Sequence, residues 1–302
     1  MSGERLHTGL WKIRFARSRR VSDFSDMAPN LVFGRQPVAL TLGGGPLATR
    51  GPETVNYRID GPPHRLLWQP FPRRVRAVLG SETVLDSRGG KLLHESNLLP
   101  QLYVPRHDVN EDLLEASAHT THCPFKGDAS YFSVRAGREL AENAVWSYPS
   151  PTEEAIWLHD HVAVHWNSMD AWFDEDDEVF GHLCDPYHRI DIRATSAHVR
   201  VQAVDGVVAE TRRAKILSET GLPNRYYVPR EDVRIELLEP SATHTVCPYK
   251  GRASYRGLRA GPGIIRDAAW FYPSPLDGAQ RIADHLCFLA EGVDTYVDGH
   301  RV

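Results

Sequence analysis

The chain has 302 residues, with 35 Lys and Arg against 39 Asp and Glu and a formal net charge of -4. Its hydrophobic fraction of 41% excludes an intrinsically disordered chain, and its balanced charge is unlike that of a nucleic-acid-binding protein. Four widely spaced cysteines do not make a disulfide framework in a protein of this size. The length allows one large domain or two ordinary ones.

Three further features are absent from the sequence, and each absence narrows the class of protein. It has no apolar run of about 18 residues, so we expect no transmembrane helix and no membrane partner. It has no compact apolar signal segment at the N-terminus, which favours a cytoplasmic location. It also has no glycine-rich phosphate loop or dinucleotide-binding fingerprint, so no organic cofactor is predicted.

Residues 1–56 form the first segment in chain order. They are rich in Arg, Gly and Pro, and the run Gly43-Gly44-Gly45-Pro46 interrupts them. This composition predicts an extension or arm. Its clustered arginines can contact an acidic partner, but the mildly negative net charge makes nucleic acid an unlikely one. These arginines include Arg14, Arg17, Arg19 and Arg20.

The rest of the chain is organised by an internal duplication. Three motifs return in the second half at a constant offset of 124 residues. They are Tyr-Val-Pro-Arg-x-Asp-Val from 103 and 227, Cys-Pro-x-Lys-Gly from 123 and 247, and Ala-x-Trp-x-Tyr-Pro-Ser-Pro from 144 and 268. A match of this extent without gaps predicts two copies of one fold.

The copies are predicted to span residues 57–174 and 198–302, with residues 175–197 as a linker that ends in a lead-in strand. Tyr57-Arg-Ile-Asp60 resembles the end of this linker, His188-Arg-Ile-Asp191. We therefore expect a lead-in strand at Tyr57–Asp60 as well, with extra residues inserted before Arg76.

Within a copy, the pattern predicts mostly strands. In the second copy, residues 199–204 alternate and lead into the turn Asp205-Gly206, which indicates a hairpin. Residues 225–228, 253–255 and 268–272 also read as strands. Short helices are expected at 232–239 and from 278, the latter passing into a strand near Cys287.

The combination of the three motifs resembles the bacterial family catalogued as domain of unknown function 427. The resemblance implies a small β-rich domain of the β-tent type, a fold shared with small-molecule-binding and zinc-binding modules. The Cys-x-x-Cys zinc knuckles of some β-tent relatives are absent here, so no zinc site is carried over. We predict a mostly β protein with short helices, built as two tandem β-tent-like domains that form a pseudo-dimer.

The Cys-Pro-x-Lys-Gly turn is the first candidate for chemistry. A lysine three residues from a thiol can favour the thiolate, which would make the cysteine a nucleophile and the lysine a cationic stabiliser. Lysine can also bind an anionic ligand group. The alternative is a buried thiol beside an ion-paired lysine. The candidate catalytic residues are Cys123, Lys126, Cys247 and Lys250.

Arginine and aromatic residues shared by the copies are candidates for ligand binding. Arginine can hold a carboxylate or phosphate, or form an internal ion pair, while Asp108 and Asp232 can cap a short helix. Alternating Trp and Tyr on a strand share one face and can line a pocket for a flat ring, or simply form core. The candidate ligand-binding residues are Arg106, Tyr131, Trp146, Tyr148, Arg230, Tyr255, Trp270 and Tyr272.

Histidines give a last set of candidates. His161 and His285, each after an aspartate, can act as general bases or be held structurally at a helix end. Two groups contain residue types that can bind a metal ion, but neither supplies the four ligands of a structural zinc site, so no metal site is predicted. These are His119, His122 and Cys123, and His182, Cys184 and His188. The second copy has Thr243, Val246 and Leu289 where the first has His119, His122 and His165, so the copies can have different roles.

Taken together, the sequence favours a cytoplasmic protein that binds a small polar or ring-bearing metabolite in a Trp/Tyr-lined pocket, as a monomer with an internal pseudo-dimer or as a homo-oligomer. If it is an enzyme, we expect a transferase or hydrolase that uses acid–base or Cys/Lys chemistry. The alternative is a non-catalytic interaction module that uses its Arg-rich N-terminal arm.

Overall fold

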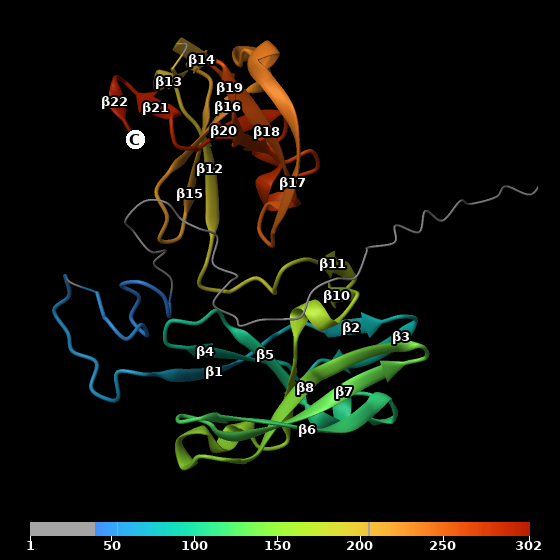
Figure 1. The fold of residues 1–302 in the computed structure, drawn as a ribbon. Helices are drawn as coiled ribbons and strands as arrows, with labels where there is room; N and C mark the ends of the chain where they lie inside the picture. The colour runs from blue at the N-terminus through green and yellow to red at the C-terminus, as the bar shows by residue number, and fades with distance from the viewer. Residues whose placement is uncertain (1–39, 53, 205) are drawn as a thin grey trace, which may run out of the picture. The chain divides into compact units, whose positions relative to one another are not determined.

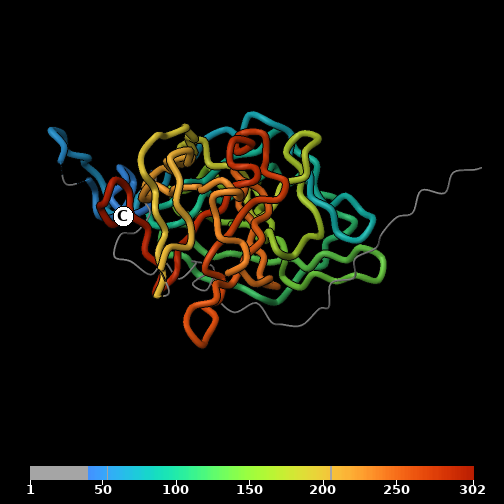
Figure 2. The backbone as a smooth tube through the Cα atoms, turned by 90° about the horizontal axis from the view of Figure 1, so that it is seen from above, coloured from blue at the N-terminus to red at the C-terminus, as the bar shows by residue number. Residues whose placement is uncertain are grey.

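The computed structural model describes residues 40–52, 54–204 and 206–302 (Figure 1). The described chain is mostly β-strand with short 3-10 helices, which confirms the predicted fold class. Each of two tandem repeats contains one seven-stranded and one four-stranded antiparallel sheet. Figure 2 traces the backbone of the repeats, from green in the first to orange and red in the second.

In the first repeat, neighbouring strands are hydrogen-bonded in the following orders. The seven-stranded sheet is β1 (Leu66–Pro70), β4 (Lys91–Glu95), β5 (Gln101–Pro105), β9 (His161–Val164), β8 (Glu139–Pro151), β7 (Gly127–Ala136) and β6 (Leu114–Cys123). The four-stranded sheet is β11 (Asp177–Val179), β10 (Ala171–Asp174), β2 (Val75–Leu79) and β3 (Glu82–Ser87).

The second repeat has the same topology, as the duplication requires. Its seven-stranded sheet is β12 (Ile190–Ala194), β15 (Lys215–Glu219), β16 (Arg225–Pro229), β20 (His285–Phe288), β19 (Gly263–Phe271), β18 (Gly251–Ala260) and β17 (Leu238–Cys247). Its four-stranded sheet is β14 (Gly206–Thr211), β13 (Val199–Ala203), β21 (Asp294–Val297) and β22 (His300–Arg301). The expected hairpin is β13–β14, although Asp205 of its turn lies outside the described residues.

The helical segments are all short 3-10 turns. They are η2 (Arg106–Asp108), η3 (Glu111–Leu113), η4 (Glu153–Leu158) and η5 (Trp166–Ser168), then η6 (Arg230–Asp232), η7 (Ile235–Leu237) and η8 (Asp277–Ile282). The single helix expected at 232–239 is wrong. Val233 has extended backbone angles that separate η6 from η7, and β17 begins at Leu238.

Asp108 and Asp232, each expected to cap a short helix in its own copy, have other partners. Asp108 accepts a hydrogen bond from the Ser87 hydroxyl at 2.6 Å, and Asp232 accepts one from Thr211 at 2.6 Å. Both bonds tie the 3-10 turn to a strand of the four-stranded sheet, β3 or β14. The role of these carboxylates is therefore to fix the turn against the sheet.

The lead-in strand of the first repeat is not Tyr57–Asp60. It is β1, which pairs with β4 as β12 pairs with β15, at the same offset and with no insertion. The matching residues are His64-Arg65 and His188-Arg189, directly before each strand. The predicted linker also contains β11, which pairs with β10 of the first repeat, so only residues 180–189 separate the strands of the two repeats.

The predicted N-terminal extension is in part a component of the first repeat. Ala48 is fully buried, Thr41 donates to the Leu98 carbonyl at 2.8 Å, and Arg65 donates to the Ala48 carbonyl at 2.8 Å. The Ser96 hydroxyl also bonds the Leu47 carbonyl. Residues 1–39, which include the clustered arginines, lie outside the described part of the chain.

Strand alternation divides the side chains of each seven-stranded sheet between two faces. In the first repeat, Leu102 and Val104 lie in the core between the two sheets, whereas Tyr103 between them belongs to a second cluster on the opposite face. Val145 and Trp146 divide in the same way. This follows from the two-residue period of a strand. The opposite face, which we call the aromatic face, carries most of the candidate site residues.

In the described chain, no helix has the length and apolar character needed to span a bilayer.

Candidate functional site

The aromatic face brings together many of the predicted site residues. In the first repeat its cluster holds Trp146 and Tyr148 from β8, with Tyr131 from β7 and Cys123 from β6 packed against them. In the second repeat the equivalent cluster holds Tyr272, with Trp270, Tyr255 and Cys247 packed against it. The expected convergence of thiol and aromatic rings on one face is therefore present in both repeats.

The indoles of Trp146 and Trp270 each have a buried hydrogen-bond partner that the sequence analysis did not identify. Trp146 Nε1 donates to the Tyr103 hydroxyl at 3.3 Å, and Trp270 Nε1 donates to the Tyr227 hydroxyl at 3.1 Å. A buried indole N–H needs such a partner. Tyr103 and Tyr227 belong to the Tyr-Val-Pro-Arg motif, so this motif orients the tryptophan of the third motif.

In the first repeat, four rings form a row across four adjacent strands, which we call the ring row: His119 of β6, Tyr131 of β7, Trp146 of β8 and His165 just after β9. Trp146 and His165 have ring centroids 4.4 Å apart, and His119 and Tyr131 are 4.5 Å apart. Tyr131 lies 6.5 Å from both Trp146 and His165. The row passes from exposed His119 through half-buried Tyr131 to Trp146, which is 8% exposed.

The strand register explains why these residues meet. Tyr131 pairs with Trp146, and Trp146 pairs with Ala163, so their side chains project from the same face. His165 is two residues beyond Ala163 and projects to that face as well. His119 reaches Tyr131 at a bulge in the β6–β7 pairing, which no sequence pattern indicated.

The second repeat keeps only the centre of this row. Tyr255 and Trp270 are paired in register with ring centroids 6.4 Å apart. Thr243 stands at the position of His119, and Leu289, 37% exposed, stands at the position of His165. Two differences between the copies therefore fall at the two ends of one row of rings.

His165 has a lowered pKa. Burial is the larger cause, because it disfavours the charged imidazolium, and the neighbouring His119 adds a smaller effect in the same direction. Burial therefore favours the neutral form of the His165 imidazole.

The lysine of each Cys-Pro-x-Lys-Gly turn is buried in an ion pair. The Lys126 ammonium contacts the Glu95 carboxylate, whose other oxygen accepts a hydrogen bond from His64 Nε2 at 2.8 Å. The side chains of Lys126 and Glu95 are only 10% and 7% exposed. The His64 ring stacks on Phe125 of the turn, with centroids 3.7 Å apart.

The second repeat has the same network, formed by Lys250, Glu219 and His188. Lys250 Nζ lies 2.6 Å from Glu219 Oε2, and His188 Nε2 lies 3.1 Å from Glu219 Oε1. Glu95 and Glu219 occupy matching positions in the two copies, but no pattern in the sequence joined them to the lysines. The histidines could have been found from the sequence, because His64-Arg65 and His188-Arg189 match at the 124-residue offset. The mistaken alignment of Tyr57–Asp60 with His188–Asp191 hid this match.

The network determines what the lysines can do. Each ammonium has a buried carboxylate partner. This arrangement agrees with the alternative given for the turn, in which the lysine beside the thiol forms an ion pair and is not a catalytic group. Lys126 also lies 5.9 Å from the centroid of the Tyr148 ring. Burial, followed by smaller effects of Cys123, Tyr131 and Glu95, raises the pKa of Tyr148 well above its usual value, so its hydroxyl stays protonated.

The glycine that ends this motif has a specific steric role. Gly127 and Gly251 both have φ of +100°, a region that side chains other than glycine rarely adopt. A Cβ at Gly127 would lie 3.0 Å from the Ser150 carbonyl oxygen, and one at Gly251 would lie 3.3 Å from that of Ser274. Glycine therefore allows the turn to pack closely against the end of β8 or the segment after β19.

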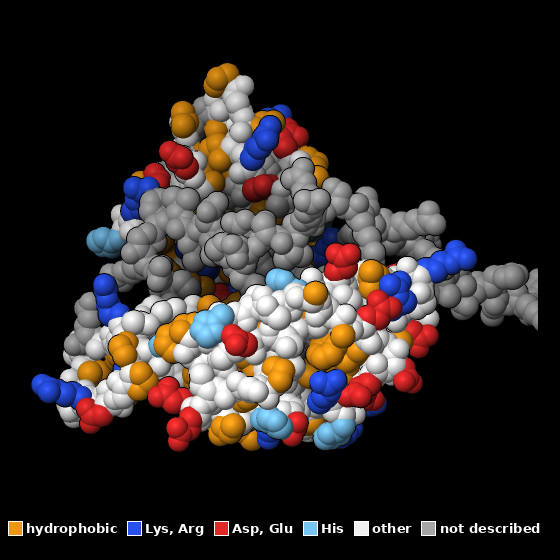
Figure 3. All heavy atoms as spheres, turned by 60° about the horizontal axis from the view of Figure 1, so that its bottom comes forward, with side chains coloured by type: hydrophobic (Ala, Val, Ile, Leu, Met, Phe, Trp, Pro, Cys, Tyr) orange, Lys and Arg blue, Asp and Glu red, His pale blue; other side chains and the backbone are white. Residues whose placement is uncertain are grey.

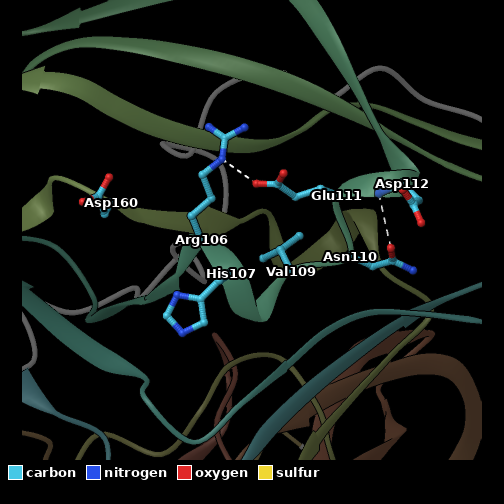
Figure 4. Close-up of a pocket in the computed structure, with 7 residues that line it drawn as sticks. All are labelled: Arg106, His107, Val109, Asn110, Glu111, Asp112 and Asp160. Atoms are coloured by element: carbon cyan, nitrogen blue, oxygen red, sulfur yellow. Dashed lines mark hydrogen bonds and ion pairs between the residues drawn. The ribbon is translucent and has the colours of Figure 1, made fainter.

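Arg106 and Arg230 do not join the aromatic face. The Arg106 guanidinium lies 5.0 Å from the ring of Phe132, which packs toward the core between the sheets, and its Nε donates to Glu111 at 2.8 Å. Arg106 instead lines a surface hollow of about 650 Å³, and Asp160 lines the same hollow (Figure 4). Arg230 and Asp284 line an equivalent hollow of about 580 Å³ in the second repeat.

The predicted general-base histidines are held by the backbone. His161 Nδ1 donates to the His159 carbonyl at 3.0 Å, and His285 Nδ1 donates to the Ala283 carbonyl at 2.6 Å. Asp160 and Asp284 before them have φ of +61° and +57°, as required by the tight turn between the 3-10 helix and the strand. This is the structural role given as the alternative.

A second group of rings occurs in the first repeat and was missed in the sequence. Trp68 of β1 lies 4.7 Å from Trp157 of η4 and 5.2 Å from His161, measured between ring centroids. In the second repeat Ile192 and Arg281 take the places of the two tryptophans, and Arg281 donates to the Ile192 carbonyl. The first repeat is thus the more aromatic of the two.

The histidine and cysteine groups noted in the sequence do not assemble as metal sites. His122 pairs with Asp128, His182 contacts the Leu183 carbonyl, and Cys184 donates to the Pro248 carbonyl. Within residues 40–52, 54–204 and 206–302, no three His, Cys, Asp or Glu side chains are grouped to hold a metal ion.

The surface adds no strong electrostatic feature on the face seen in Figure 3. Acidic and basic side chains are interspersed there, and hydrophobic side chains occur in small separate groups. Such a face does not favour a polyanionic partner.

Comparison with known proteins agrees with the duplicated fold. No match was found among curated proteins. One family model, described as a domain of unknown function, matches the chain twice, at residues 67–175 and 191–299. Both matches coincide with the two-sheet repeats and include the Cys-Pro-x-Lys-Gly turn and the Trp/Tyr strand. The chain therefore belongs to the DUF427 family, of which it contains two tandem copies.

Proposed function

We propose that this protein binds a ring-bearing small molecule against the aromatic face of a seven-stranded sheet. The observation that carries the proposal is the Tyr–Trp pair on adjacent strands, Tyr131 with Trp146 and Tyr255 with Trp270. In each pair the tryptophan is fixed by its hydrogen bond and the tyrosine is only half-buried. Rigid rings beside a partly open surface are suited to stacking on a flat ligand.

The contacts of the basic residues support binding by stacking rather than by charge. Lys126 and Lys250 each have a buried carboxylate partner, and Arg106 contacts Glu111 and Phe132 away from the aromatic face. Removing a lysine from its carboxylate to meet an anionic ligand would leave a buried charge unpaired, which is costly. On the aromatic face, these residues therefore offer no available cation to the negative ligand group expected from the sequence.

Catalysis by the Cys/Lys pair is less well supported than binding. A lysine that stabilises a thiolate needs its ammonium free for that charge, whereas Lys126 is engaged by Glu95. The proposal therefore assigns Cys123 and Cys247 to the wall of the aromatic face. The cytoplasmic location, the oligomeric state and a role of the arginine-rich arm remain predictions from the sequence.

The test uses three small probes with one ring system and different charges: nicotinamide (neutral), nicotinate (anionic) and 1-methylnicotinamide (cationic), with cyclohexanol as a non-planar control. Saturation-transfer NMR on the full chain measures contact with the protein. We expect transfer to at least one ring probe and none to cyclohexanol.

The site is assigned with the double variant Tyr131→Leu/Tyr255→Leu, which keeps apolar bulk but removes both half-buried rings. We expect it to abolish the ring-probe signal, whereas Tyr57→Ala, at a tyrosine 50% exposed and outside both sheets, leaves the signal unchanged. The absence of ring binding in the wild-type protein, or full binding in the double variant, contradicts the proposal.

A further inference from the structure

We propose that the second repeat binds a small oxyanion, a phosphate or a carboxylate, between the guanidinium groups of Arg230 and Arg256. This is a second binding site, away from the aromatic face, and it goes beyond the proposed function. Both repeats keep an arginine at the end of the Tyr-Val-Pro-Arg motif, but they differ at the two positions that contact it. The inference depends on those two differences.

In the first repeat, the arginine of the motif has two partners within the protein. Arg106 Nε donates to the Glu111 carboxylate at 2.8 Å, as the dashed line in Figure 4 marks. The guanidinium of Arg106 also lies 5.0 Å from the centroid of the Phe132 ring. Glu111 therefore balances the charge of this arginine, and Phe132 packs beside it.

In the second repeat, both partners of the arginine are replaced. Ile235 stands at the position of Glu111, and Arg256 stands at the position of Phe132. Strands β17 and β18 pair in the same register as β6 and β7, so these positions are spatially equivalent and place Arg230 beside Arg256. Among the described residues, the ion pairs of this repeat involve other basic side chains, and neither of these two arginines has a carboxylate partner.

The surface beside Arg230 is hollowed, and two of its acidic side chains are already paired. Arg230 lines a hollow of about 580 Å³ together with Glu231 and Glu236. Glu231 lies 3.2 Å from Arg213, and Glu236 accepts a hydrogen bond from Arg234 at 3.0 Å. Arginines other than Arg230 therefore balance these two carboxylates.

Asp284 is the acidic residue of this hollow that opposes an anion. It is exposed, and no ion pair joins its carboxylate to another described residue. Its backbone carbonyl accepts a hydrogen bond from the Arg230 N–H at 3.0 Å, which keeps the two residues close. Like charges repel at short range, so we expect Asp284 to weaken anion binding.

Arg256 reaches the site from the side of the sheet opposite the aromatic face. It follows Tyr255 on β18, and successive side chains of a strand point to opposite sides. Its guanidinium lies 5.4 Å from the centroid of the Phe271 ring. Contact with a ring orients a guanidinium but does not occupy its N–H donors, which remain available to an anion.

The charge of the two repeats also favours the second one for an anion. Residues 66–179 contain 9 Lys and Arg against 19 Asp and Glu, whereas residues 190–302 contain 15 against 14. One of these differences lies close to the site, because Arg252 replaces Asp128 and is on the same face of β18 as Arg256. An anion therefore meets less repulsion at the second repeat.

The chemistry of the guanidinium group sets the class of ligand. Its planar fork of N–H donors matches two oxygens of a carboxylate or a phosphate. Two neighbouring guanidinium groups repel each other, and an oxyanion between them removes that repulsion. A phosphate dianion balances both charges, whereas a carboxylate balances one, so we expect phosphate to bind more tightly.

The experiment titrates the full chain with inorganic phosphate at pH 7.5 and constant ionic strength, and follows the arginine side-chain Nε–Hε signals by NMR. Spectra of Arg230→Gln and Arg256→Phe assign the two signals. We expect both signals to shift and saturate in the wild-type protein, with a dissociation constant at least about fivefold below that of acetate, the carboxylate probe. The absence of a saturable shift at both signals overturns the proposal.

Two substitutions in the hollow predict opposite effects. Ile235→Glu restores the acidic partner of the first repeat, and we expect it to weaken phosphate binding about tenfold or more. Asp284→Asn removes a repelling carboxylate, and we expect it to strengthen binding about twofold or more; asparagine tolerates the φ of +57° there. Arg266→Gln, at an exposed arginine on β19, is the control for loss of one positive charge and should leave binding unchanged.

A variant of the first repeat keeps the test independent of folding defects in the second. Glu111→Ile/Phe132→Arg gives the first repeat the residues of the second, and we expect phosphate to cause a new saturable shift at the Arg106 signal. Thermal unfolding of each variant checks that it is folded.

The outcomes also separate this site from the aromatic face. Weaker phosphate binding in Asp284→Asn, or an equal loss in Arg266→Gln and Arg256→Phe, contradicts the proposal. Tyr131→Leu/Tyr255→Leu should leave phosphate binding unchanged, and Arg256→Phe should leave the ring-probe signal unchanged. Either proposal can therefore fail while the other stands.

Discussion

The ammonium of Lys250 lies 2.6 Å from the carboxylate of Glu219, and both side chains are about nine-tenths buried. The same pair, Lys126 with Glu95, occurs in the first repeat, and in each repeat a histidine from the segment before the first strand completes it. The network joins three segments that are distant in sequence. It therefore holds the Cys-Pro-x-Lys-Gly turn against the opposite end of the sheet.

Removing one member of the pair should be strongly destabilising. Lys250→Met leaves Glu219 buried without its cation, and we expect a loss of about 3–5 kcal/mol in the free energy of unfolding of the second repeat. Urea denaturation followed by fluorescence measures the change. Arg234→Met at the exposed Arg234–Glu236 pair is the control, with an expected change below about 0.5 kcal/mol. Equal effects of the two substitutions would show that burial of the pair is unimportant.

The same carboxylate should make the second repeat sensitive to acid. Burial acts to raise the pKa of Glu219, but hydrogen bonds and charge from His188 and Lys250 outweigh it, so the pKa is lowered. Its stabilising effect is complete above the unfolded pKa of about 4.5 and is lost as the pH falls through the lower folded value. Glu219→Gln should lower stability at pH 7 and flatten its decline below about pH 4.5. Unfolding curves between pH 3 and 7 measure both; an unchanged slope would contradict the assignment.

His94 should destabilise the first repeat as the pH falls. Its side chain is fully buried, and neither ring nitrogen has a hydrogen-bond partner among the described residues. Burial lowers its pKa, against a smaller opposing effect of Asp185. The unfolded chain therefore binds the proton more readily, and stability is lost as the pH falls below about 6.5.

The substitution His94→Leu tests this. It removes the unpaired polar group, so we expect a gain of about 1 kcal/mol at pH 6 and a flatter pH dependence between 5 and 7. The matched control is His107→Leu, since that side chain is 84% exposed and should show neither effect. Thermal unfolding as a function of pH provides the measurement, and a destabilised His94→Leu protein at pH 5 would argue against a buried, unpaired imidazole.

The glycine of the turn should not tolerate a side chain. In Gly127→Ala the new Cβ would adopt φ of +100° and approach the Ser150 carbonyl oxygen at 3.0 Å, so we expect a loss of roughly 1–3 kcal/mol. Gly278→Ala is a control, because that position has open space around it and no positive φ. Chemical denaturation of both variants decides the matter, and similar stabilities would refute the steric explanation.

The four thiols should react at different rates. Burial, the larger cause in both cases, raises the pKa of Cys184 to about 11 and that of Cys287 to about 12, so few thiolates form there at pH 8. Cys123 and Cys247 are only partly buried. Timed alkylation with iodoacetamide and peptide mass spectrometry should show Cys287 reacting last. Early labelling of Cys287 in the folded protein would contradict its burial.

Much of the fold could be predicted from residue patterns. The constant 124-residue offset established two copies, and alternation with turn residues located strands such as β13, β16 and β18, because a strand repeats every two residues. The short helix at 232–239 was wrong because a few apolar residues in sequence cannot distinguish one helix from two 3-10 turns. The strand predicted at Tyr57–Asp60 was wrong because these four residues resemble His188–Asp191 in type, whereas His64-Arg65 is the pair at the 124-residue offset from His188-Arg189.

The site was predictable only in part. Trp146 and Tyr148 were placed correctly on one face, since alternate positions on a strand point to the same side. The partners of Lys126, the separation of Arg106 from the aromatic face and the contacts of His119 and His165 with Tyr131 depend on strand order, register and a bulge. These contacts join residues far apart in the chain, so their geometry is set by packing across the sheet. Motifs in the sequence therefore identified the two repeats and the residue types of the candidate site. Strand order and register in the folded sheets determine which of those residues are in contact.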